Sequence, residues 1–186
     1  KKMDMLPIEC IVRGYFYGSL FSRWENGKIS LDKDTPTDLA AQLPKPIFDP
    51  TTKSTHDIPL DKEQAISQEL VTSREYDWLS EKSIKIYQKM VTIADNAGFV
   101  LADLKLEFGK LNDEIILADS IGPDEFRLWP KNTYKIGKTQ EAFDKQLLRD
   151  WLTENGYQKK FEDARLSGEE PIAPSIPSDL ISKMTQ

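Results

Sequence analysis

Apolar residues recur with a period of two in some stretches of the chain and with a helical period in others, which predicts a mixed α+β fold. Between residues 6 and 13 the alternation predicts a strand whose buried face is made of Leu6, Ile8, Cys10 and Val12. Glu9, Ile11 and Arg13 fall on the opposite face of this strand. We expect an aromatic-rich turn and a short helix over 15–24, and a brief strand over 28–31.

Helical spacing is clearest in the middle of the chain. Thr72 and Glu75 have the spacing of a capping box, and the apolar stripe that follows consists of Ile84, Tyr87, Met90, Val91 and Ala94. Gly98 predicts the end of this helix. A second helix is expected over 139–152, and a third helical pattern begins after Pro177.

A β-hairpin is expected from residues 99–109 and 114–119, joined around Asn112-Asp113. On its first strand the alternation places Asp103, Lys105 and Glu107 on one face, and Ala102, Leu104, Leu106 and Phe108 on the other. Neighbours on one face of a strand lie about 7 Å apart, so Lys105 would stand between two carboxylates. On pattern alone the simpler interpretation is a solvated face with alternating charges.

Two long segments lack a regular pattern. Five prolines, at positions 36, 44, 46, 50 and 59, interrupt residues 32–60 and predict a long mobile loop. Residues 154–177 are polar and contain proline, which predicts a linker to a terminal helix. Together the elements predict one α+β lobe over 1–186, in which an antiparallel sheet packs against helices.

Composition narrows the classes of partner. The 186 residues include 25 Lys and Arg against 31 Asp and Glu, a net charge of -6, and no dense basic tract that could neutralise a nucleic-acid backbone. No apolar run approaches the roughly 18 residues needed to span a bilayer, and the first residues lack the apolar core of a signal peptide. We therefore expect a cytoplasmic protein without nucleic-acid or membrane partners. The chain enters a strand almost at once and stops early in a helical pattern, so a missing front and tail are expected.

Cysteine and histidine provide neither a metal site nor a catalytic triad. The chain has one of each, Cys10 and His56. Cys10 faces the apolar side of its strand and is interpreted as a core residue. His56-Asp57 has no serine or cysteine motif nearby, so nucleophilic catalysis is not expected. Any metal must therefore be bound by carboxylates.

The register of the expected hairpin decides whether two carboxylates meet. If Lys110 pairs with Glu114 across a three-residue turn, Asp119 falls opposite Lys105 and on the same face as Glu107. Two acids together with phosphate oxygens and water suit Mg²⁺. A shift of register by one residue would put Asp119 on the wrong face and remove this site.

Candidate anion-binding residues are Arg13, Gly18, Ser19, Arg127, Lys145 and Arg149. The first three belong to a glycine-containing turn whose amides and hydroxyl could surround a phosphate, although many glycine turns share this pattern. Lys145 and Arg149 are four residues apart on the 139–152 helix, and taken alone this pair is more simply a solvated helix surface.

Four separated segments, taken together and in order, resemble the phosphoribosylaminoimidazole-succinocarboxamide synthase (SAICAR synthetase) family. The first is LPIECIVRGYFYGS over residues 6–19, and the second is LADLKLEFG over 101–109. The third runs from Asp119 to Trp129, with a proline and Arg127 between them, and the fourth is FDKQLLRD over 143–150. The resemblance covers nearly the whole chain.

The resemblance implies the larger lobe of a two-lobed, ATP-grasp-like fold, without the N-terminal lobe and the end of the C-terminal helix. It implies a ligase of purine biosynthesis that joins L-aspartate to the carboxylate of 5-amino-1-(5-phospho-D-ribosyl)imidazole-4-carboxylate. ATP becomes ADP and phosphate, and the reaction passes through an acyl phosphate. ATP and Mg²⁺ are the implied cofactors, the ribonucleotide, L-aspartate and ATP are the implied partners, and a homo-oligomer is compatible with the family.

The family's functional residues carry over to matching positions in this sequence. Glu107 and Asp119 would hold Mg²⁺ on the nucleotide phosphates, and Lys105 would neutralise charge during phosphoryl transfer. Asp103 would orient Lys105 or the imidazole amine. The ribonucleotide, chiefly its 5′-phosphate, would be bound by Arg13, Gly18, Ser19, Arg127, Lys145 and Arg149.

A loop that closes over the nucleotide and aspartate would contain Lys53, His56 and Asp57. This segment departs from the family, which commonly has Glu-Asn where this chain has Ile58-Pro59, and Tyr17 replaces a Thr or Ala before Gly18.

Two other functions stay open at this level. Metal carboxylates and a lysine do not name the phosphoryl acceptor, so another ATP-dependent phosphotransferase on the same scaffold is one alternative. The other is an inactive lobe that binds a ribonucleotide or mediates oligomerisation. Because 186 residues would enclose only half of the nucleotide, we expect the chain alone to be weakly active or inactive.

Overall fold

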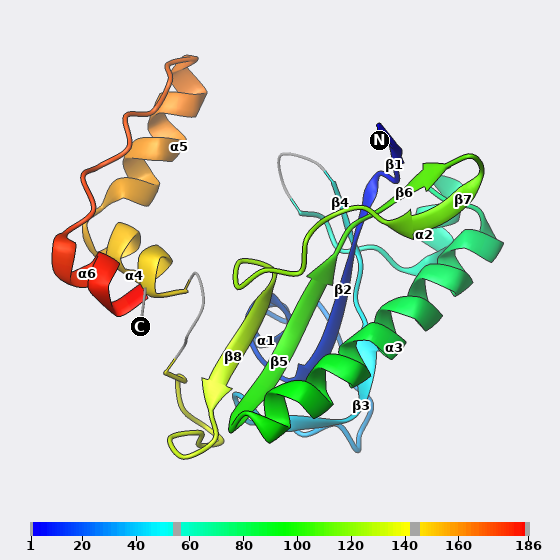
Figure 1. Ribbon diagram of the computed structural model, residues 1–186, viewed down its shortest axis with the longest axis horizontal. Helices are drawn as coiled ribbons and strands as arrows, with labels where there is room; N and C mark the ends of the chain where they lie inside the picture. The colour runs from blue at the N-terminus through cyan, green and yellow to red at the C-terminus, as the bar shows by residue number, and fades with distance from the viewer. Residues whose placement is uncertain (1, 54–56, 142–145, 185–186) are drawn as a thin grey trace. The chain divides into compact units, whose positions relative to one another are not determined.

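The computed structural model of the chain describes residues 2–53, 57–141 and 146–184 (Figure 1). It divides into two compact units, residues 1–141 and residues 142–186. The larger unit is α+β and the smaller one is helical, and the assignment of 1–186 to one lobe of a larger enzyme stays a prediction.

Two antiparallel sheets form the framework of the first unit. The larger has the order β3-β2-β5-β8, and β4 pairs with the beginning of β2. Its strands are β2 (Ile8–Tyr15), β3 (Gln42–Phe48), β4 (Thr51–Thr52), β5 (Phe99–Leu106) and β8 (Phe126–Pro130). The smaller sheet, in the order β1-β6-β7, consists of β1 (Asp4–Met5), β6 (Phe108–Leu111) and β7 (Glu114–Leu117). The predicted α+β class with antiparallel sheets and helices is confirmed.

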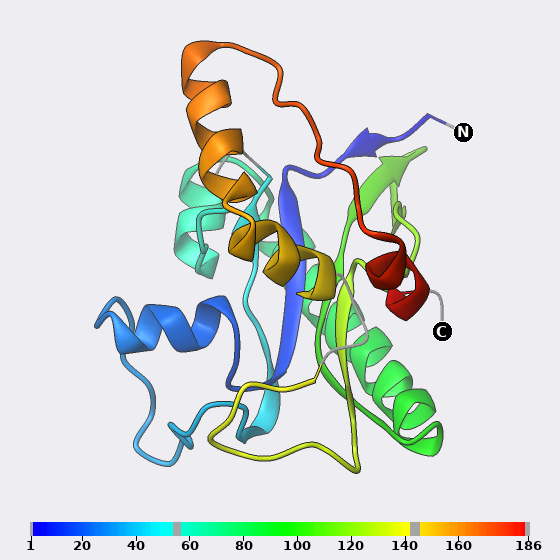
Figure 2. The same ribbon diagram turned by 90° about the vertical axis from the view of Figure 1, so that its left-hand side faces the viewer.

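Helices α1 (Ser19–Glu25) and α3 (Ser73–Asn96) lie on opposite sides of the larger sheet (Figure 2), and α2 (Lys62–Ser67) packs beside α3. The predicted capping box is present, because Thr72 Oγ1 accepts from the Glu75 amide and Glu75 accepts from the Thr72 amide. The expected core face of the first strand is also buried, and α3 covers it. Among the described residues, no helix combines the length and apolar character that would let it cross a membrane.

A β-bulge in β5, between Leu101 and Asp103, changes which residues share a face. Leu101 packs with Leu104 and Leu106 under α3, whereas Ala102 joins Val100 and Trp129 in a separate cluster. The expected placement of Ala102 with Leu104 is therefore wrong, because the extra residue of the bulge reverses the alternation.

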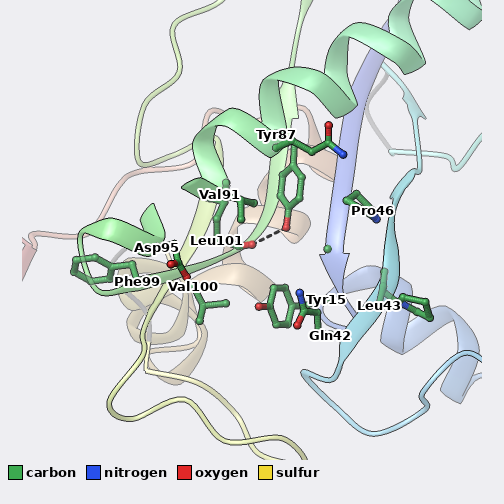
Figure 3. Close-up of a pocket in the computed structure, with 13 residues that line it drawn as sticks. Tyr15, Gln42, Leu43, Pro46, Tyr87, Val91, Asp95, Phe99, Val100 and Leu101 are labelled. Atoms are coloured by element: carbon green, nitrogen blue, oxygen red, sulfur yellow. Dashed lines mark hydrogen bonds between the residues drawn. The ribbon is translucent and has the colours of Figure 1, made fainter. Parts of the chain in front are cut away.

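The hydroxyl of Tyr87 reaches the sheet beside this bulge (Figure 3). It donates a hydrogen bond of 2.7 Å to the Leu101 carbonyl oxygen and lies beside a small cavity of about 190 Å³. Gly14 makes room for it, since a Cβ at this position would lie 1.9 Å from the Tyr87 hydroxyl oxygen. The hydrogen bond thus supplies a donor to a backbone carbonyl at the bulge.

The hairpin has a different register from the one expected. Leu111 pairs with Glu114 and Lys110 with Ile115, across a two-residue turn in which Asn112 and Asp113 both have positive φ, 53° and 63°. Such a turn matches the twist of the flanking strands and fixes the register. The Ala118 amide donates to the Glu107 carbonyl, so the ladder brings Ala118 opposite Glu107, where the expected register would have placed Leu117.

The segment 32–60 is more regular than its prolines suggested. It contains β3 and β4, and β3 includes Pro44 and Pro46. β3 lies at the edge of the larger sheet. An edge strand tolerates proline, because on its outer side no neighbouring strand needs a backbone N–H donor. The brief strand expected over 28–31 is absent there, and Ile29 and Leu31 instead pack against the cluster around Phe16.

The second unit has three described helices: α4 (Gln146–Glu154), α5 (Tyr157–Ser167) and α6 (Ser178–Met184). Helix α4 packs against α5 and α6. The helix expected over 139–152 is not helical at 139–141, and its described part begins at Gln146. The expected linker 154–177 is wrong in part because α5 lies within it, while the helix expected after Pro177 is confirmed as α6.

Candidate active site

A row of arginine and aspartate side chains crosses the larger sheet on the face opposite α3. Arg13 of β2 lies directly opposite Asp103 of β5, and Asp103 lies directly opposite Arg127 of β8. Strand pairing therefore places one acid between two bases. Asp49 and Arg23 complete this set, which we call the arginine row: Arg13, Arg23, Asp49, Asp103 and Arg127.

Arg13 is the most buried member of the arginine row, with 4% of its side chain exposed. Its Nε donates to Asp49 Oδ2 at 2.5 Å and its Nη2 donates to Ser19 Oγ at 2.8 Å. Its Nη1 lies 3.6 Å from Asp103 Oδ2. Three protein oxygens on different elements thus fix the plane of the guanidinium.

Arg127 forms an ion pair with Asp103 and keeps 20% of its side chain exposed. Its guanidinium also lies 5.8 Å from the centre of the Tyr17 ring. Gly18 has φ +61°, and a Cβ there would stand 3.0 Å from Arg127 Nη1. A glycine at this position therefore lets the turn before α1 approach the guanidinium closely.

Lys105 follows Asp103 on the same face of β5, and three glutamates surround it. Lys105 Nζ lies 2.9 Å from Glu125, 3.0 Å from Glu107 and 3.5 Å from Glu9. Lys53 forms an ion pair with Glu107 from the other side. We call this set the lysine–glutamate cluster: Glu9, Lys53, Lys105, Glu107 and Glu125.

The cluster keeps its central charges ionised. Burial alone would lower the pKa of Lys105, but the glutamates outweigh it, with Glu125 foremost, and raise that pKa above its ordinary value. Burial would likewise raise the pKa of Glu107, yet Lys53 and Lys105 hold it below its ordinary value. Lys105 therefore acts as a fixed positive charge and not as a proton donor near neutral pH.

The two sets carry opposite net charges. Three arginines against two aspartates leave one positive charge in the arginine row, and two lysines against three glutamates leave one negative charge in the cluster. Ile11 and Lys105 form the second backbone pair along from Arg13 and Asp103, which is the next pair on the same face, so the two sets are neighbours on that face. This arrangement can accept an anionic group at one end and a cation at the other.

The sequence pattern of the SAICAR synthetase family matches residues 1–164 of the chain. The chain belongs to this family. It is 67% identical over 186 residues to the phosphoribosylaminoimidazole-succinocarboxamide synthase of Nitrosopumilus maritimus, covering 100% of the chain and 68% of that relative.

Two solved SAICAR synthetase structures agree with the fold. The Saccharomyces cerevisiae SAICAR synthase complexed with SAICAR matches with a TM-score of 0.75 and 33% identity, over 99% of this chain and 58% of that one. A SAICAR synthetase in complex with ADP matches with a TM-score of 0.65 and 28% identity, over 92% of this chain and 67% of that one. The chain thus spans between 58% and 68% of the length of these three family members.

Most of the residues expected from the SAICAR synthetase motifs lie in or beside the two sets. Arg13, Ser19, Gly18, Asp103 and Arg127 meet at the arginine row. The structure pairs Asp103 with the two arginines, and the orientation of Lys105 rests on Glu9, Glu107 and Glu125 instead. The expected role of Asp103 in orienting Lys105 therefore lacks the contact it needs.

The remaining expected residues are exposed or fall outside the described residues. Asp119 is exposed, and its Oδ1 accepts from the Ser120 amide at 2.7 Å. Because the register differs, the strand pairing that was expected to bring Asp119 to Glu107 does not occur. Asp57 is exposed, and Arg149 lies exposed on α4 in the second unit. His56 and Lys145 lie outside the described residues.

Four members of the two sets were missed in the sequence: Glu9, Arg23, Asp49 and Glu125. Glu9 could have been predicted from the sequence, because it shares a strand face with Arg13. Asp49 and Arg23 come from the edge of β3 and from α1, and no periodicity links them to β2. Only the fold brings these two side chains to the arginine row.

Proposed function

We propose that the chain forms the substrate-binding lobe of an ATP-dependent SAICAR synthetase. The enzyme joins the amine of L-aspartate to the carboxylate of 5-amino-1-(5-phospho-D-ribosyl)imidazole-4-carboxylate and yields SAICAR, ADP and phosphate. Its partners are these small molecules, and its place is the cytoplasm, where purine precursors are made. The observation that carries the proposal is the pair of oppositely charged sets on one sheet face of a SAICAR synthetase family member.

The arginine row is suited to the 5′-phosphate of the ribonucleotide. It carries one net positive charge, and the guanidinium of Arg127 is partly exposed to solvent. A planar guanidinium can donate two parallel hydrogen bonds to phosphate oxygens. Gly18 lies directly beside the Arg127 guanidinium, and the Ser19 hydroxyl accepts a hydrogen bond from Arg13 at the start of α1.

Lys105 is suited to the phosphoryl-transfer step. In the first step a carboxylate oxygen of the ribonucleotide attacks the γ-phosphorus of ATP, the bond to the bridging oxygen breaks, and ADP leaves. In the second step the uncharged amine of aspartate attacks the acyl carbon, the C–N bond forms, and phosphate leaves as the amine loses a proton. A fixed ammonium group stabilises the negative charge that gathers on the transferred group in the first step.

The carboxylates present fit a hard cation that completes its shell with other ligands. No three acidic, histidine or cysteine side chains gather into a metal cage in the part of the chain that the structure describes. A cation here would therefore need phosphate oxygens and water, as Mg²⁺ bound to ATP does. Glu107, held ionised, would hold Mg²⁺, which screens the charge of the nucleotide phosphates. The expected share of Asp119 in this site loses its support, because the hairpin register does not pair it toward Glu107.

The test is a product assay with substrates omitted in turn. The purified full-length protein, not the 186-residue segment alone, is incubated with ATP, Mg²⁺ and the ribonucleotide, with and without L-aspartate, and products are identified by mass spectrometry. We expect one SAICAR for each ADP, and only when aspartate is present. A phosphorylated acceptor that accumulates without aspartate would instead indicate a phosphotransferase. Ribonucleotide binding without any ADP release would indicate the inactive lobe.

A further inference from the structure

Asp49 ties three elements of the first unit together. It follows the last residue of β3, and its amide donates to the Ile11 carbonyl of β2 at 2.8 Å. Its Oδ2 accepts from Arg13 Nε on β2 and from Arg23 Nη2 on α1, both at 2.5 Å. Neither the family motifs nor the proposed chemistry assigns this residue a role.

The electrostatic surroundings make this contact strong. The side chains of Arg13, Arg23 and Asp49 are 4%, 15% and 14% exposed, so water screens their charges only weakly. Burial would raise the pKa of Asp49, but the two arginines hold it below its ordinary value. Asp49 therefore stays ionised and stays bound to both guanidinium groups near neutral pH.

The bond to Asp49 also determines the direction of the other two guanidinium nitrogens of Arg13. Because Nε donates to Asp49, Nη2 points to Ser19 and Nη1 points to Asp103. Without Asp49, Arg13 would lose one of its two acidic partners and would draw more strongly on Asp103, the acid that also pairs with Arg127. A change at the sheet edge would thus reach the partly exposed Arg127 through two ion pairs.

We propose that Asp49 is a positioning residue for the ribonucleotide site, which holds the guanidinium of Arg13 in place and leaves Asp103 to Arg127. The inference rests on the proposed function, because it assumes that the arginine row receives the phosphate of the ribonucleotide. Asp49 itself does not touch the substrate.

Asp49→Asn tests this role, since it removes the charge and keeps the size of the side chain. We expect the KM and the Kd for the ribonucleotide to rise about tenfold, while the KM for ATP and for L-aspartate changes less than about twofold. Asp49→Glu keeps the charge and should recover part of the ribonucleotide affinity. The ribonucleotide Kd is measured by calorimetry and the KM values by SAICAR formation.

Glu75→Gln is the matched control. Glu75 is a partly buried acid paired with Lys110 outside the arginine row, with 18% of its side chain exposed. Both variants should lower the unfolding temperature, but only Asp49→Asn should weaken ribonucleotide binding. Loss of stability with unchanged ribonucleotide KM and Kd would overturn the inference while the proposed function stands. A wild-type protein that neither binds nor converts the ribonucleotide would contradict both.

Discussion

The arginine row and the lysine–glutamate cluster are built on the same strands and yet differ in net charge and in supporting elements. In the row, Arg13 is bound to Asp49, the residue after β3, and Asp49 is bound to Arg23 of α1. The cluster draws its acids from β2, from the break after β5 and from the residue before β8. Its Lys53 is 39% exposed, whereas Arg13 of the row is 4% exposed. The row is thus the more enclosed of the two.

This difference suggests a division of labour. An enclosed set of arginines with one surplus positive charge suits a substrate group that is held throughout the reaction, such as a sugar phosphate. A more open cluster with a surplus negative charge suits a cation that arrives with a nucleotide. Substitutions in the cluster should therefore change turnover, and substitutions in the row should change ribonucleotide affinity.

Lys105→Met should have the largest effect. It removes the fixed charge among three glutamates, and we expect turnover to fall about a hundredfold to a thousandfold. The ribonucleotide Kd should change far less, because the arginine row is untouched. Steady-state rates measure the loss of turnover, and calorimetry measures the ribonucleotide Kd.

Lys110→Met is the control for that variant, since Lys110 pairs with Glu75 outside the cluster. Its turnover should stay within about twofold of wild type. Equal losses of turnover in the two variants would remove the special role assigned to Lys105.

Arg127→Ala tests the arginine row in the way that Lys105→Met tests the cluster. It deletes the partly exposed cation of the row, and we expect the ribonucleotide Kd to rise about thirtyfold, with the ATP Kd nearly constant. Lys131→Ala, just beyond the end of β8 and paired with Asp95, is the control and should leave both constants unchanged. A parallel loss of ATP affinity in Arg127→Ala would show that the row and the cluster do not act separately.

The sequence predicted the pieces of these sets better than their assembly. The alternation of β2 and the capping box of α3 are local patterns, and both appear as expected. Arg13, Asp103, Arg127 and Lys105 could be named because family motifs carry them. The pairing of Arg13 with Asp49 could not, because 36 residues separate them and an edge strand rich in proline lies between.

Register was the main source of error, for a physical reason. Asn112 and Asp113 adopt positive φ and close the hairpin in two residues, which shifts every following side chain by one relative to a three-residue turn. The bulge between Leu101 and Asp103 has the same effect on Ala102. A single residue of turn or bulge reverses a face, and alternation alone does not reveal it.

Gly14→Ala tests the support beneath the arginine row. The new Cβ would lie 1.9 Å from the Tyr87 hydroxyl oxygen, which must then move away from the Leu101 carbonyl at the bulge before Asp103. We expect a loss of about 2 kcal/mol in the free energy of unfolding. Tyr87→Phe removes the clashing oxygen, so the double variant should be more stable than the sum of the two single changes predicts. Additive losses, measured by denaturant unfolding, would contradict this account.

The pair of Glu75 and Lys110 gives the smallest effect and a reference outside both sets. The hydrogen bonds from Lys110 and Thr72 lower the pKa of Glu75 from its ordinary 4.5 to about 2. A carboxyl with a depressed pKa in the folded state stabilises the protein above the ordinary pKa, and this contribution is lost as the pH falls toward the depressed value. Glu75→Gln should therefore be about 1 kcal/mol less stable than wild type near neutral pH. The difference should shrink as the pH is lowered from about 5 to about 2, which urea unfolding of both proteins measures. At neutral pH the two proteins should bind the ribonucleotide equally well, because the pair touches neither set. A stability difference that does not change with pH would show that the charge of Glu75 contributes nothing.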